Sequence, residues 1–463
     1  MINLNDLFKI ETKGFYNIEK LDKISFEKAA IDSRTIEKKD LFFAVKGDNT
    51  DGHKYLKSIF AKGVKAAVVN ESWFRKNKKD FKNNSFVITA DTIRSLGELA
   101  ANYRNKFDIP VLCIGGSNGK TTTKDLTASV LSQKYKVHKT TGNFNNHIGL
   151  PLVLLSMKED SEMCVLEVGA NHFNEIKYLC DIARPTAGLV TNIGREHLEF
   201  FKNLKGVAKA EFELYDYLIK NNGDCFINYD DEYIREYSKK KSTSGKRKIS
   251  YSYKHRTSVK GKFVKYNNKF EPVIEIKSSD KDFDTNISTF GKHSIYNGLA
   301  AAAVGIHYGL SSSQIKRGLS GFKPSSSKRM ELLRSKKGVT IINDTYNSNP
   351  DSVKMGIETL KEFKTKGRKF VILGDMLELG SSSKKEHAEI GKLVKHNSLE
   401  NLFTYGEQSY NTFLSASGIE NNIYFENKED LGKEISEKAL KGDVIYLKGS
   451  RGMKMEEIIK FIP

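Results

Sequence analysis

The stretch that most constrains the fold is Val111–Lys124, which reads VLCIGGSNGKTTTK. Its first four residues, Val111–Ile114, are apolar and predict a short buried strand. A glycine-rich loop and a Lys-Thr pair follow, and then Leu126 and Val130 stand four residues apart, as on one face of a helix. A strand, a glycine loop and a helix start in this order predict a phosphate-binding loop. The alternative is a glycine-rich turn without a ligand.

The chemistry of this loop predicts a nucleotide polyphosphate with a magnesium ion. Glycines let backbone N–H groups turn onto an anion, and the helix N-terminus adds partial positive charge. We expect Lys120 to contact the β- and γ-phosphates and the Thr121 hydroxyl to bind Mg²⁺. The loop is a shortened form of the usual pattern, because Ile114 stands five residues before Gly119. The predicted loop residues are Gly116, Ser117, Asn118, Gly119, Lys120, Thr121 and Thr122.

Length and cysteine usage favour a multidomain protein of a reducing compartment. A chain of 463 residues exceeds one ordinary core, so we expect two or three domains. The four cysteines are far apart and form no C-x-x-C pair, which favours buried thiols over disulfides or a zinc site. The start of the chain lacks the features of a signal peptide, and no apolar run reaches the roughly 18 residues of a membrane span. We therefore expect a cytoplasmic protein without membrane insertion.

The net charge of +19 is compatible with nucleic acid, an anionic membrane surface or anionic small substrates. The densest basic block, Lys239–Lys248, is mixed with serine and glycine. It lacks the interleaved aromatic residues of a single-strand binding platform. We predict a solvated loop there and no nucleic-acid binding.

The pattern of apolar runs predicts an α/β protein of three domains. Residues 1–106 form a small α/β domain, within which the basic segment 72–85 is expected at the surface. Residues 107–322 alternate between strands and helices, as in a doubly wound parallel sheet, with β-hairpins added within 249–287. Residues 323–463 resume the alternation as a Rossmann-like domain after a hinge at 323–327.

Polar residues stand where the predicted strands end. Ligands of open α/β sheets bind beyond the carboxyl ends of strands, so these residues are site candidates. The strand over Met163–Leu166 ends in Glu167, where a metal-holding carboxylate is expected downstream of a phosphate loop. The strand over Gly188–Ile193 leads to His197, a second candidate metal ligand. Strands of the last domain also run into polar or glycine segments, and we expect a cleft between two domains.

These motifs resemble those of the Mur ligases, over nearly the whole chain. The matching segments are GGSNGKTTTK (115–124), TTGNFNNHIGLP (140–151), LEVGANHFNEI (166–176), RPTAGLVTNIGREHLEFF (184–201), GKHSIYNGLAAAA (291–303), NDTYNSNPDS (343–352), GDMLELG (374–380) and KGSRGMKMEE (448–457). The N-terminal segment IDSRTIEKKDLFFAVKG (31–47) resembles the family's uridine-nucleotide-binding domain.

The resemblance implies an ATP-dependent amide ligase that acts through an acyl phosphate in peptidoglycan synthesis. Segments 343–352, 374–380 and 448–457 resemble the branch that joins D-alanyl-D-alanine to UDP-N-acetylmuramoyl-tripeptide. We expect ATP and Mg²⁺ as cofactors and a monomer. The alternatives are a sister ligase that adds one amino acid, a folylpolyglutamate synthase, a basic nucleic-acid-binding ATPase and a non-catalytic binding partner. The third residue of the tripeptide, lysine or diaminopimelate, stays open.

The resemblance also implies residue roles. The metal ligands would be Thr121, Glu167, His197 and Glu211, and the nucleotide would contact Lys120, His293, Asn297, Arg329 and Asp344. The substrate residues would be Ser33, Arg34, Asn143, Asn145, Asn146, Asn347 and Asn349, with Lys448 and Arg451 as cationic donors to the tetrahedral intermediate.

Three positions depart from the family pattern. Ser294 stands where the adenine segment usually has asparagine, and Asn343 leaves Asp344 as the only carboxylate of a usually acidic pair. Glu211 stands where the family often has a carbamylated lysine that binds a second Mg²⁺. Our hypothesis is that Glu211 holds this metal directly or through water. The rival is a modified Lys209, which would point about 200° away on a helix, and the remaining alternative is that Glu211 is a surface residue.

Overall fold

The computed structural model describes residues 1–21, 23–47, 50–240, 248–324 and 328–463. Parts of two segments discussed above, 241–247 of the basic block and 325–327 of the hinge, lie outside the described residues. By compactness the chain divides into two units. One holds Met1–Gly115, Lys134–Leu189 and Glu213–Cys225, and the other holds Gly116–Gln133, Val190–Phe212 and Phe226–Pro463.

Three sheets form the framework, and each lies within one of the three predicted domains. The α/β class is therefore confirmed, while the boundaries near residues 106 and 322 stay predictions. All four cysteines are buried and free, as expected. Among the described residues, no helix combines the length and apolar character that a membrane crossing needs.

The first sheet has the strand order β1-β5-β4-β3-β2, in which only β1 is antiparallel to its neighbour. Its strands are β1 (Gly14–Tyr16), β2 (Ala29–Ala30), β3 (Leu41–Phe43), β4 (Ala66–Asn70) and β5 (Ser85–Thr89). Its helices are α1 (Leu4–Leu7), α2 (Leu56–Ala61), α3 (Glu71–Asn77) and α4 (Thr92–Arg104). Asp91 caps α4 by accepting hydrogen bonds from the N–H groups of Ile93 and Arg94.

An aromatic cluster surrounds Phe86 on β5. The rings of Phe60, Phe74 and Phe81 lie 5.4 to 5.7 Å from the Phe86 ring, and Trp73 lies 6.2 Å away. The expectation that segment 72–85 is a surface segment is therefore wrong in part. All of its lysines are exposed, but α3 and the following 3-10 helix (Lys78–Phe81) place Phe74 and Phe81 in the core.

The second sheet has nine strands in the order β14-β13-β12-β11-β10-β9-β6-β8-β7. They are β6 (Val111–Gly115), β7 (Val137–Lys139), β8 (Met163–Glu167), β9 (Ala187–Val190), β10 (Asp224–Asn228), β11 (Lys248–Ser252), β12 (Val259–Tyr266), β13 (Pro272–Lys277) and β14 (Asp282–Asn286). The pairs β6–β8 and β7–β8 are parallel, whereas β12, β13 and β14 form the expected antiparallel addition. The strand predicted over Gly188–Ile193 ends at Val190, so the next residues form a loop.

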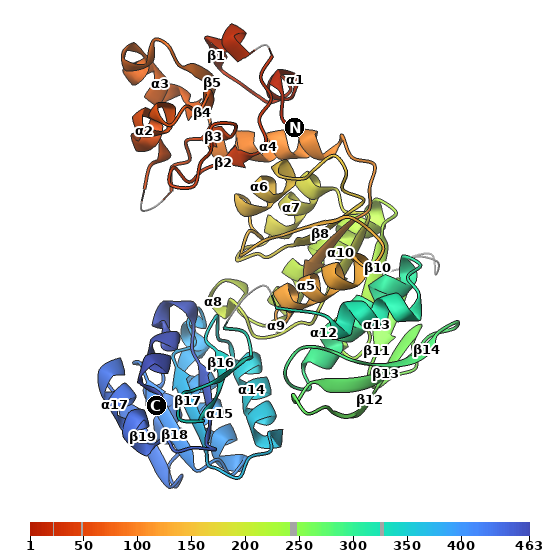
Figure 1. The fold of residues 1–463 in the computed structure, drawn as a ribbon, viewed down its shortest axis with the longest axis vertical. Coiled ribbons are helices and arrows are strands. Elements are labelled where there is room, and N and C mark those ends of the chain that lie inside the picture. The colour runs from red at the N-terminus through yellow and green to blue at the C-terminus, as the bar shows by residue number, and fades with distance from the viewer. Residues whose placement is uncertain (22, 48–49, 241–247, 325–327) are drawn as a thin grey trace. The chain divides into compact units, whose positions relative to one another are not determined.

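Helices of this middle region carry several of the candidate residues. They are α5 (Lys120–Leu131), α6 (Gly149–Leu155), α7 (Glu175–Ala183), α8 (Leu198–Phe201), α9 (Leu204–Glu211), α10 (Glu213–Lys220), α11 (Glu232–Lys240), α12 (Ser294–His307) and α13 (Ser312–Ser320). Helix α5 packs on α12 and α13, so the helix that begins at the glycine loop is held on one side by two others (Figure 1).

The third sheet has the order β15-β16-β20-β17-β18-β19, in which only β15 is antiparallel to its neighbour. Its strands are β15 (Glu331–Arg334), β16 (Thr340–Asp344), β17 (Lys369–Gly374), β18 (Asn401–Tyr405), β19 (Asn421–Phe425) and β20 (Val444–Lys448), and its helices are α14 (Pro350–Glu362), α15 (Ser383–His396), α16 (Tyr410–Ser415) and α17 (Lys428–Lys438). Figure 1 shows α17 on one side of the sheet and α14 and α15 on the other. Sequence patterns predicted only β16, β17 and β20 among these strands.

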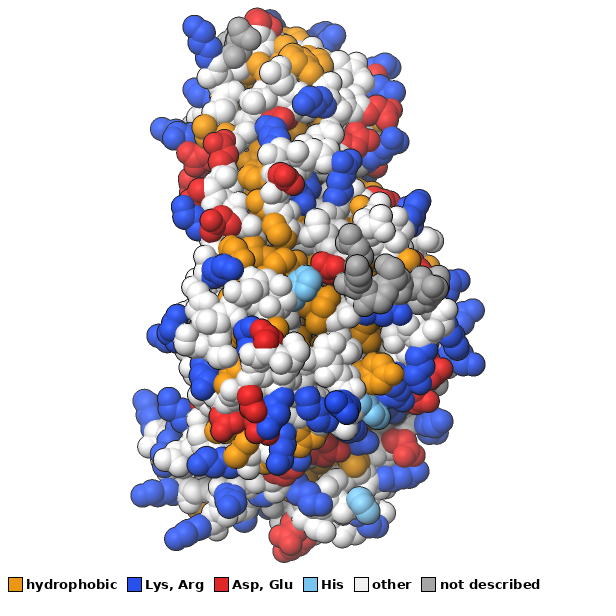
Figure 2. Space-filling view, turned by 90° about the vertical axis from the view of Figure 1, so that its right-hand side faces the viewer, with side chains coloured by type: hydrophobic (Ala, Val, Ile, Leu, Met, Phe, Trp, Pro, Cys, Tyr) orange, Lys and Arg blue, Asp and Glu red, His pale blue; other side chains and the backbone are white. Residues whose placement is uncertain are grey.

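The basic side chains do not gather in one place on the face drawn in Figure 2. Lys and Arg occur over the whole of this face, with Asp and Glu among them. The charge of +19 therefore produces a scattered rather than a single basic surface here.

The substitution Phe86→Ala tests the aromatic cluster. We expect it to lower the free energy of unfolding of the N-terminal sheet by about 3–5 kcal/mol, because a buried ring is lost from a packed core. Trp73 is the only tryptophan of the chain, so its fluorescence during urea unfolding reports on this cluster. Phe8→Ala is the control, because Phe8 is 54% exposed. Equal midpoints for wild type and Phe86→Ala would contradict the assignment.

Candidate functional site

The glycine loop joins β6 to α5. At two positions its backbone conformation and close contacts suit only glycine. Gly116 and Gly119 have φ values of 111° and 81°. A Cβ atom on Gly116 would lie 2.2 Å from the Thr191 hydroxyl, and one on Gly119 would lie 2.6 Å from Asn297 Oδ1. Gly119 is also the N-cap of α5 and has no side chain to cap the first-turn N–H groups. These N–H groups suit an anion.

A second loop, 191–197, is fastened to the glycine loop by hydrogen bonds. Ser117 N donates to Asn192 O at 2.9 Å, and Asn118 N donates to Asn192 Oδ1 at 3.1 Å. The Thr191 hydroxyl and Asn192 Nδ2 both donate to Asn118 O, at 2.7 and 2.8 Å. Gly194 N donates to Ser117 Oγ at 2.7 Å. The two loops therefore form one polar framework.

Glu211 lies at this framework, as the sequence hypothesis requires. It ends α9, its side chain is 4% exposed, and its Oε2 accepts a hydrogen bond from Gly116 N at 2.6 Å. The alternative that Glu211 is a surface residue is therefore excluded. Lys209, two residues earlier on the helix, is exposed.

Lys120 also has a carboxylate partner that sequence reasoning missed. Its Nζ lies 3.2 Å from Glu196 Oε2 and also donates to the carbonyl of Gly116. The only signal in the sequence was the position of Glu196 directly before the candidate ligand His197. The fastened loop 191–197 thus places a buried carboxylate on the lysine of the phosphate loop.

Glu167 ends β8 beside the strand that feeds the glycine loop. It pairs in parallel register with Ile114 of β6, and its side chain is buried. Its Oε1 accepts a hydrogen bond from Asn145 Nδ2 at 3.0 Å, and its backbone N–H donates to the Thr140 hydroxyl. Its Oε2 is buried and has no hydrogen-bond partner in the part of the chain that the structure describes. A buried carboxylate oxygen without a donor fits a cation.

His197 lies in the left-handed region, with φ 47°, at the start of α8. Its Nδ1 lies 2.6 Å from Glu378 Oε2, and this imidazole lowers the pKa of the Glu378 carboxyl. Glu199 N also donates to Glu378 O at 3.2 Å. His197 is therefore positioned by the GDMLELG segment. Among residues whose placement is described, no three His, Cys, Asp or Glu side chains form a group that would hold a metal ion.

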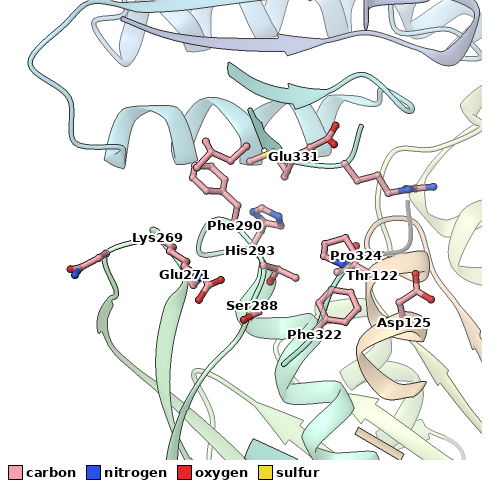
Figure 3. Close-up of a pocket in the computed structure, with 15 residues that line it drawn as sticks. Thr122, Asp125, Lys269, Glu271, Ser288, Phe290, His293, Phe322, Pro324 and Glu331 are labelled. Atoms are coloured by element: carbon pink, nitrogen blue, oxygen red, sulfur yellow. The ribbon is translucent and has the colours of Figure 1, made fainter. Parts of the chain in front are cut away.

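A cavity of about 650 Å³ lies beside the first turn of α5. Thr122 and Asp125 of α5, Phe290, His293, Arg329 and Glu331 are among the residues that line it (Figure 3). Figure 3 shows His293 close to Phe290, near the middle of this set. Burial lowers the pKa of His293, so the ring is neutral at pH 7. Its buried Nδ1 has no hydrogen-bond partner among the described residues. The cavity thus offers an aromatic wall and a neutral imidazole.

Asn297, Asp344 and Arg329, three further residues predicted to contact the nucleotide, have contacts within the protein. Asn297 Oδ1 accepts a hydrogen bond from the Thr123 hydroxyl at 3.1 Å and touches Gly119, so Asn297 supports the glycine loop. Asp344 Oδ2 pairs with Lys448 Nζ at 2.5 Å. Arg329 stacks on the ring of Tyr346, with 3.8 Å from its guanidinium carbon to the ring centre.

The predicted substrate residues of the C-terminal sheet differ in their freedom to contact a ligand. Lys448 is 3% exposed, and besides Asp344 it donates to Asn347 O at 2.9 Å. Asn349 caps α14 and donates from Nδ2 to Asn118 Oδ1 at 3.0 Å. Arg451 is 57% exposed and pairs with Glu456 at 2.8 Å. Arg451 is thus the more accessible of the two predicted cationic donors.

The remaining predicted substrate residues lie in the other unit. Arg34 pairs with Asp32 at 2.7 Å and lowers the pKa of that carboxyl to about 2, while Ser33 O accepts a hydrogen bond from Lys62 Nζ at 2.6 Å. Asn143 is exposed. Asn146 Oδ1 accepts a hydrogen bond at 2.9 Å from the N–H of Gly149, the first residue of α6.

Arg195 is a further residue that the sequence did not single out. Its Nη2 lies 2.6 Å from Asp351 Oδ1, and its Nη1 lies 2.9 Å from Glu386 Oε2. Its backbone N–H donates to Asp351 Oδ2 at 2.7 Å. Both acids lie in first turns of helices, α14 and α15, where negative charge is favourable.

Comparison with known proteins identifies the family. Family models match in three places: the Mur ligase family catalytic domain over residues 27–105, the Mur ligase middle domain over 114–305 and the Mur ligase glutamate ligase domain over 328–451. The UDP-N-acetylmuramoyl-tripeptide–D-alanyl-D-alanine ligase of Bacillus subtilis is 35% identical over 442 residues, covering 93% of this chain and 92% of its own.

Solved structures agree with the sequence comparison. A crystal structure of MurF from Acinetobacter baumannii superposes with a TM-score of 0.87 at 25% identity, covering 99% of this chain and 98% of its own. The MurF ligase of Thermotoga maritima, crystallised in complex with ADP, superposes with a TM-score of 0.79 at 26% identity, covering 94% and 96%. The chain therefore belongs to the Mur ligase family, and within it to the MurF branch.

Proposed function

We propose that this protein joins D-alanyl-D-alanine to UDP-N-acetylmuramoyl-tripeptide at the expense of ATP. The products are UDP-N-acetylmuramoyl-pentapeptide, ADP and phosphate, and the enzyme acts as a cytoplasmic monomer. The observation that carries the proposal is a complete phosphate loop, with Gly116, Gly119, Lys120 and Thr121 in place, in a chain that matches a full-length relative bearing this activity's name.

The phosphates of the nucleotide bind at the glycine loop, and its base binds in the cavity lined by His293 and Arg329. Thr122 and Asp125 line the cavity, and both belong to α5, the helix that begins at the phosphate loop. The ADP complex of the Thermotoga maritima relative supports adenine nucleotide binding. Asn297 supports nucleotide binding indirectly, because it contacts Gly119 and Thr123 at the start of α5. Asp344 also acts indirectly, through its ion pair with Lys448.

Thr121, Glu167, His197 and Glu211 would be the Mg²⁺ ligands that the family resemblance implies. The hydroxyl of Thr121 and the carboxylates of Glu167 and Glu211 are hard oxygen ligands, and Glu167 Oε2 is buried without a donor among the described residues. When bound, this ion neutralises phosphate charge during transfer. Asn145 orients Glu167, and Glu378 orients His197.

The chemistry requires activation because a carboxylate is a poor acyl donor. An oxygen of the tripeptide's terminal carboxylate attacks the γ-phosphorus of ATP, the bond to the bridging oxygen breaks, and ADP leaves. The amine of D-alanyl-D-alanine then attacks the acyl carbon, phosphate leaves with the bonding electrons, and the nitrogen loses a proton. Lys120 lowers the repulsion between the carboxylate and the phosphate, which are both anions.

Some of the remaining candidate residues would contact the substrates, and the others support the structure of the site. Arg34 with Ser33 would meet the uridine diphosphate, and the loop bearing Asn143, Asn145 and Asn146 would meet the muramoyl-peptide. Arg451 is the candidate donor to the tetrahedral intermediate. The side chains of Lys448 and Asn349 are hydrogen-bonded within the protein. Together with Asn347 they stabilise the conformation of the segment 344–351.

The reaction can be tested with UDP-N-acetylmuramoyl-tripeptide, ATP and Mg²⁺. We expect phosphate release that depends on D-alanyl-D-alanine, with the UDP-pentapeptide detected by mass spectrometry. Tripeptides ending in lysine or diaminopimelate should both be tried. Release with a single amino acid only would instead identify a sister ligase. No release with any acceptor, from folded protein that binds ATP, would overturn the proposed activity.

Glu211→Gln tests the unusual metal ligand. We expect turnover to fall by at least about 100-fold, because losses of roughly 10–100-fold already follow from changes to groups that only support a ligand. Lys209→Gln is the matched control on the same helix and should keep near-normal turnover. Activity of both variants is measured against Mg²⁺ concentration. Wild-type turnover of Glu211→Gln at low Mg²⁺ would contradict the assignment, and loss of activity in Lys209→Gln would favour the rival lysine.

A further inference from the structure

The contact between Lys120 and Glu196 brings a second carboxylate to the phosphate loop. The two side chains are 15% and 10% exposed, and their charged atoms are 3.2 Å apart. An ion pair shielded in this way is weakened little by salt, unlike a surface pair. Lys120 is also the residue that the γ-phosphate of ATP needs.

Glu196 is held in this position by the backbone around it. The loop 191–197 is bonded to Ser117 and Asn118 of the phosphate loop. Glu196 N donates to Gly194 O at 2.9 Å, so the turn that carries the side chain is closed. On its other side the loop is fixed by the pairing of Arg195 with Asp351. The backbone that carries Glu196 is therefore fixed on both sides.

A triphosphate entering the loop therefore meets negative charge that the protein itself provides. Glu196 lies at Lys120, and Glu211 lies at Gly116 N. Phosphate oxygens compete with these carboxylates for the same cation and the same amide. Like charges at such distances repel by more than thermal energy when partly shielded from water. A divalent cation on the phosphates removes most of this repulsion.

We propose that Glu196 is a specificity-determining residue that makes the phosphate loop select nucleotide carrying a divalent cation over metal-free nucleotide. Its carboxylate competes for Lys120 and repels an uncompensated triphosphate. The proposal rests on the function proposed above, since it assumes that the loop binds ATP. In this proposal Glu196 is not a metal ligand, because its carboxylate pairs with Lys120.

Calorimetric titration with ATP tests this directly, once in excess MgCl₂ and once in EDTA. Glu196→Gln keeps the shape of the side chain and removes its charge. We expect it to tighten binding of metal-free ATP on the order of 10-fold, while binding of MgATP changes by less than about twofold. The matched control is Glu199→Gln, which removes the same charge from an exposed position of the same segment and should change neither affinity. Glu196→Asp withdraws the carboxylate and should shift metal-free binding in the same direction by less, which keeps the test valid if Glu196→Gln does not fold.

The outcomes separate the inference from the function on which it rests. Unchanged metal-free binding in Glu196→Gln would overturn the inference and leave the ligase assignment standing. Weaker binding of MgATP with unchanged metal-free binding would also overturn it, because Glu196 would then be a metal ligand. Equal tightening in Glu199→Gln would reduce the effect to net charge and overturn it as well. A wild type that binds ATP in neither buffer would overturn both the inference and the proposed function.

Discussion

The close backbone contact between the glycine loop and the loop after β9 is the constraint on which the site depends. The space at Gly116 is so small that an added Cβ would lie 2.2 Å from the Thr191 hydroxyl. Hydrogen bonds from Ser117 and Asn118 to Asn192 fix the same contact. Glu196 and His197 follow on this second loop, so the backbone contact fixes the segment that carries both side chains.

Charge at the loop is balanced by partners from distant parts of the chain. Lys120 and Gly116 N–H meet the carboxylates of Glu196 and Glu211, which are 76 and 95 residues away in sequence. The same design recurs in the C-terminal sheet, where Asp344 at the end of β16 meets Lys448 at the end of the parallel neighbour β20. Buried charges of this kind are costly alone and are therefore found in pairs.

Two further contacts hold acidic side chains at these loops. Glu211 stands where the family resemblance implies a modified lysine, and its Oε2 accepts a hydrogen bond from Gly116 N of the glycine loop. Asp351 and Glu386, in the first turns of α14 and α15, form ion pairs with Arg195, which precedes Glu196 in the sequence. The loop that bears His197 is consequently held from the phosphate loop and from α14 and α15.

Local patterns in the sequence were sufficient for the strand–glycine loop–helix unit, for β16, β17 and β20, and for the identity of Glu167 and His197 as strand-end candidates. Each of these depends on residues within about one turn or one strand of each other, so periodicity and glycine placement identify them. Strands β18 and β19, the burial of Phe74 and Phe81, and the pairing of Glu196 with Lys120 escaped the sequence. They depend on which segments the sheet order brings together, and no local spacing encodes that. The sequence by itself determined a phosphate loop in an α/β protein of this family. The tertiary structure decided that Glu211 is buried against the loop, that Lys448 is committed to Asp344, and that Lys120 already has a carboxylate beside it, because burial and pairing are properties of neighbours in space.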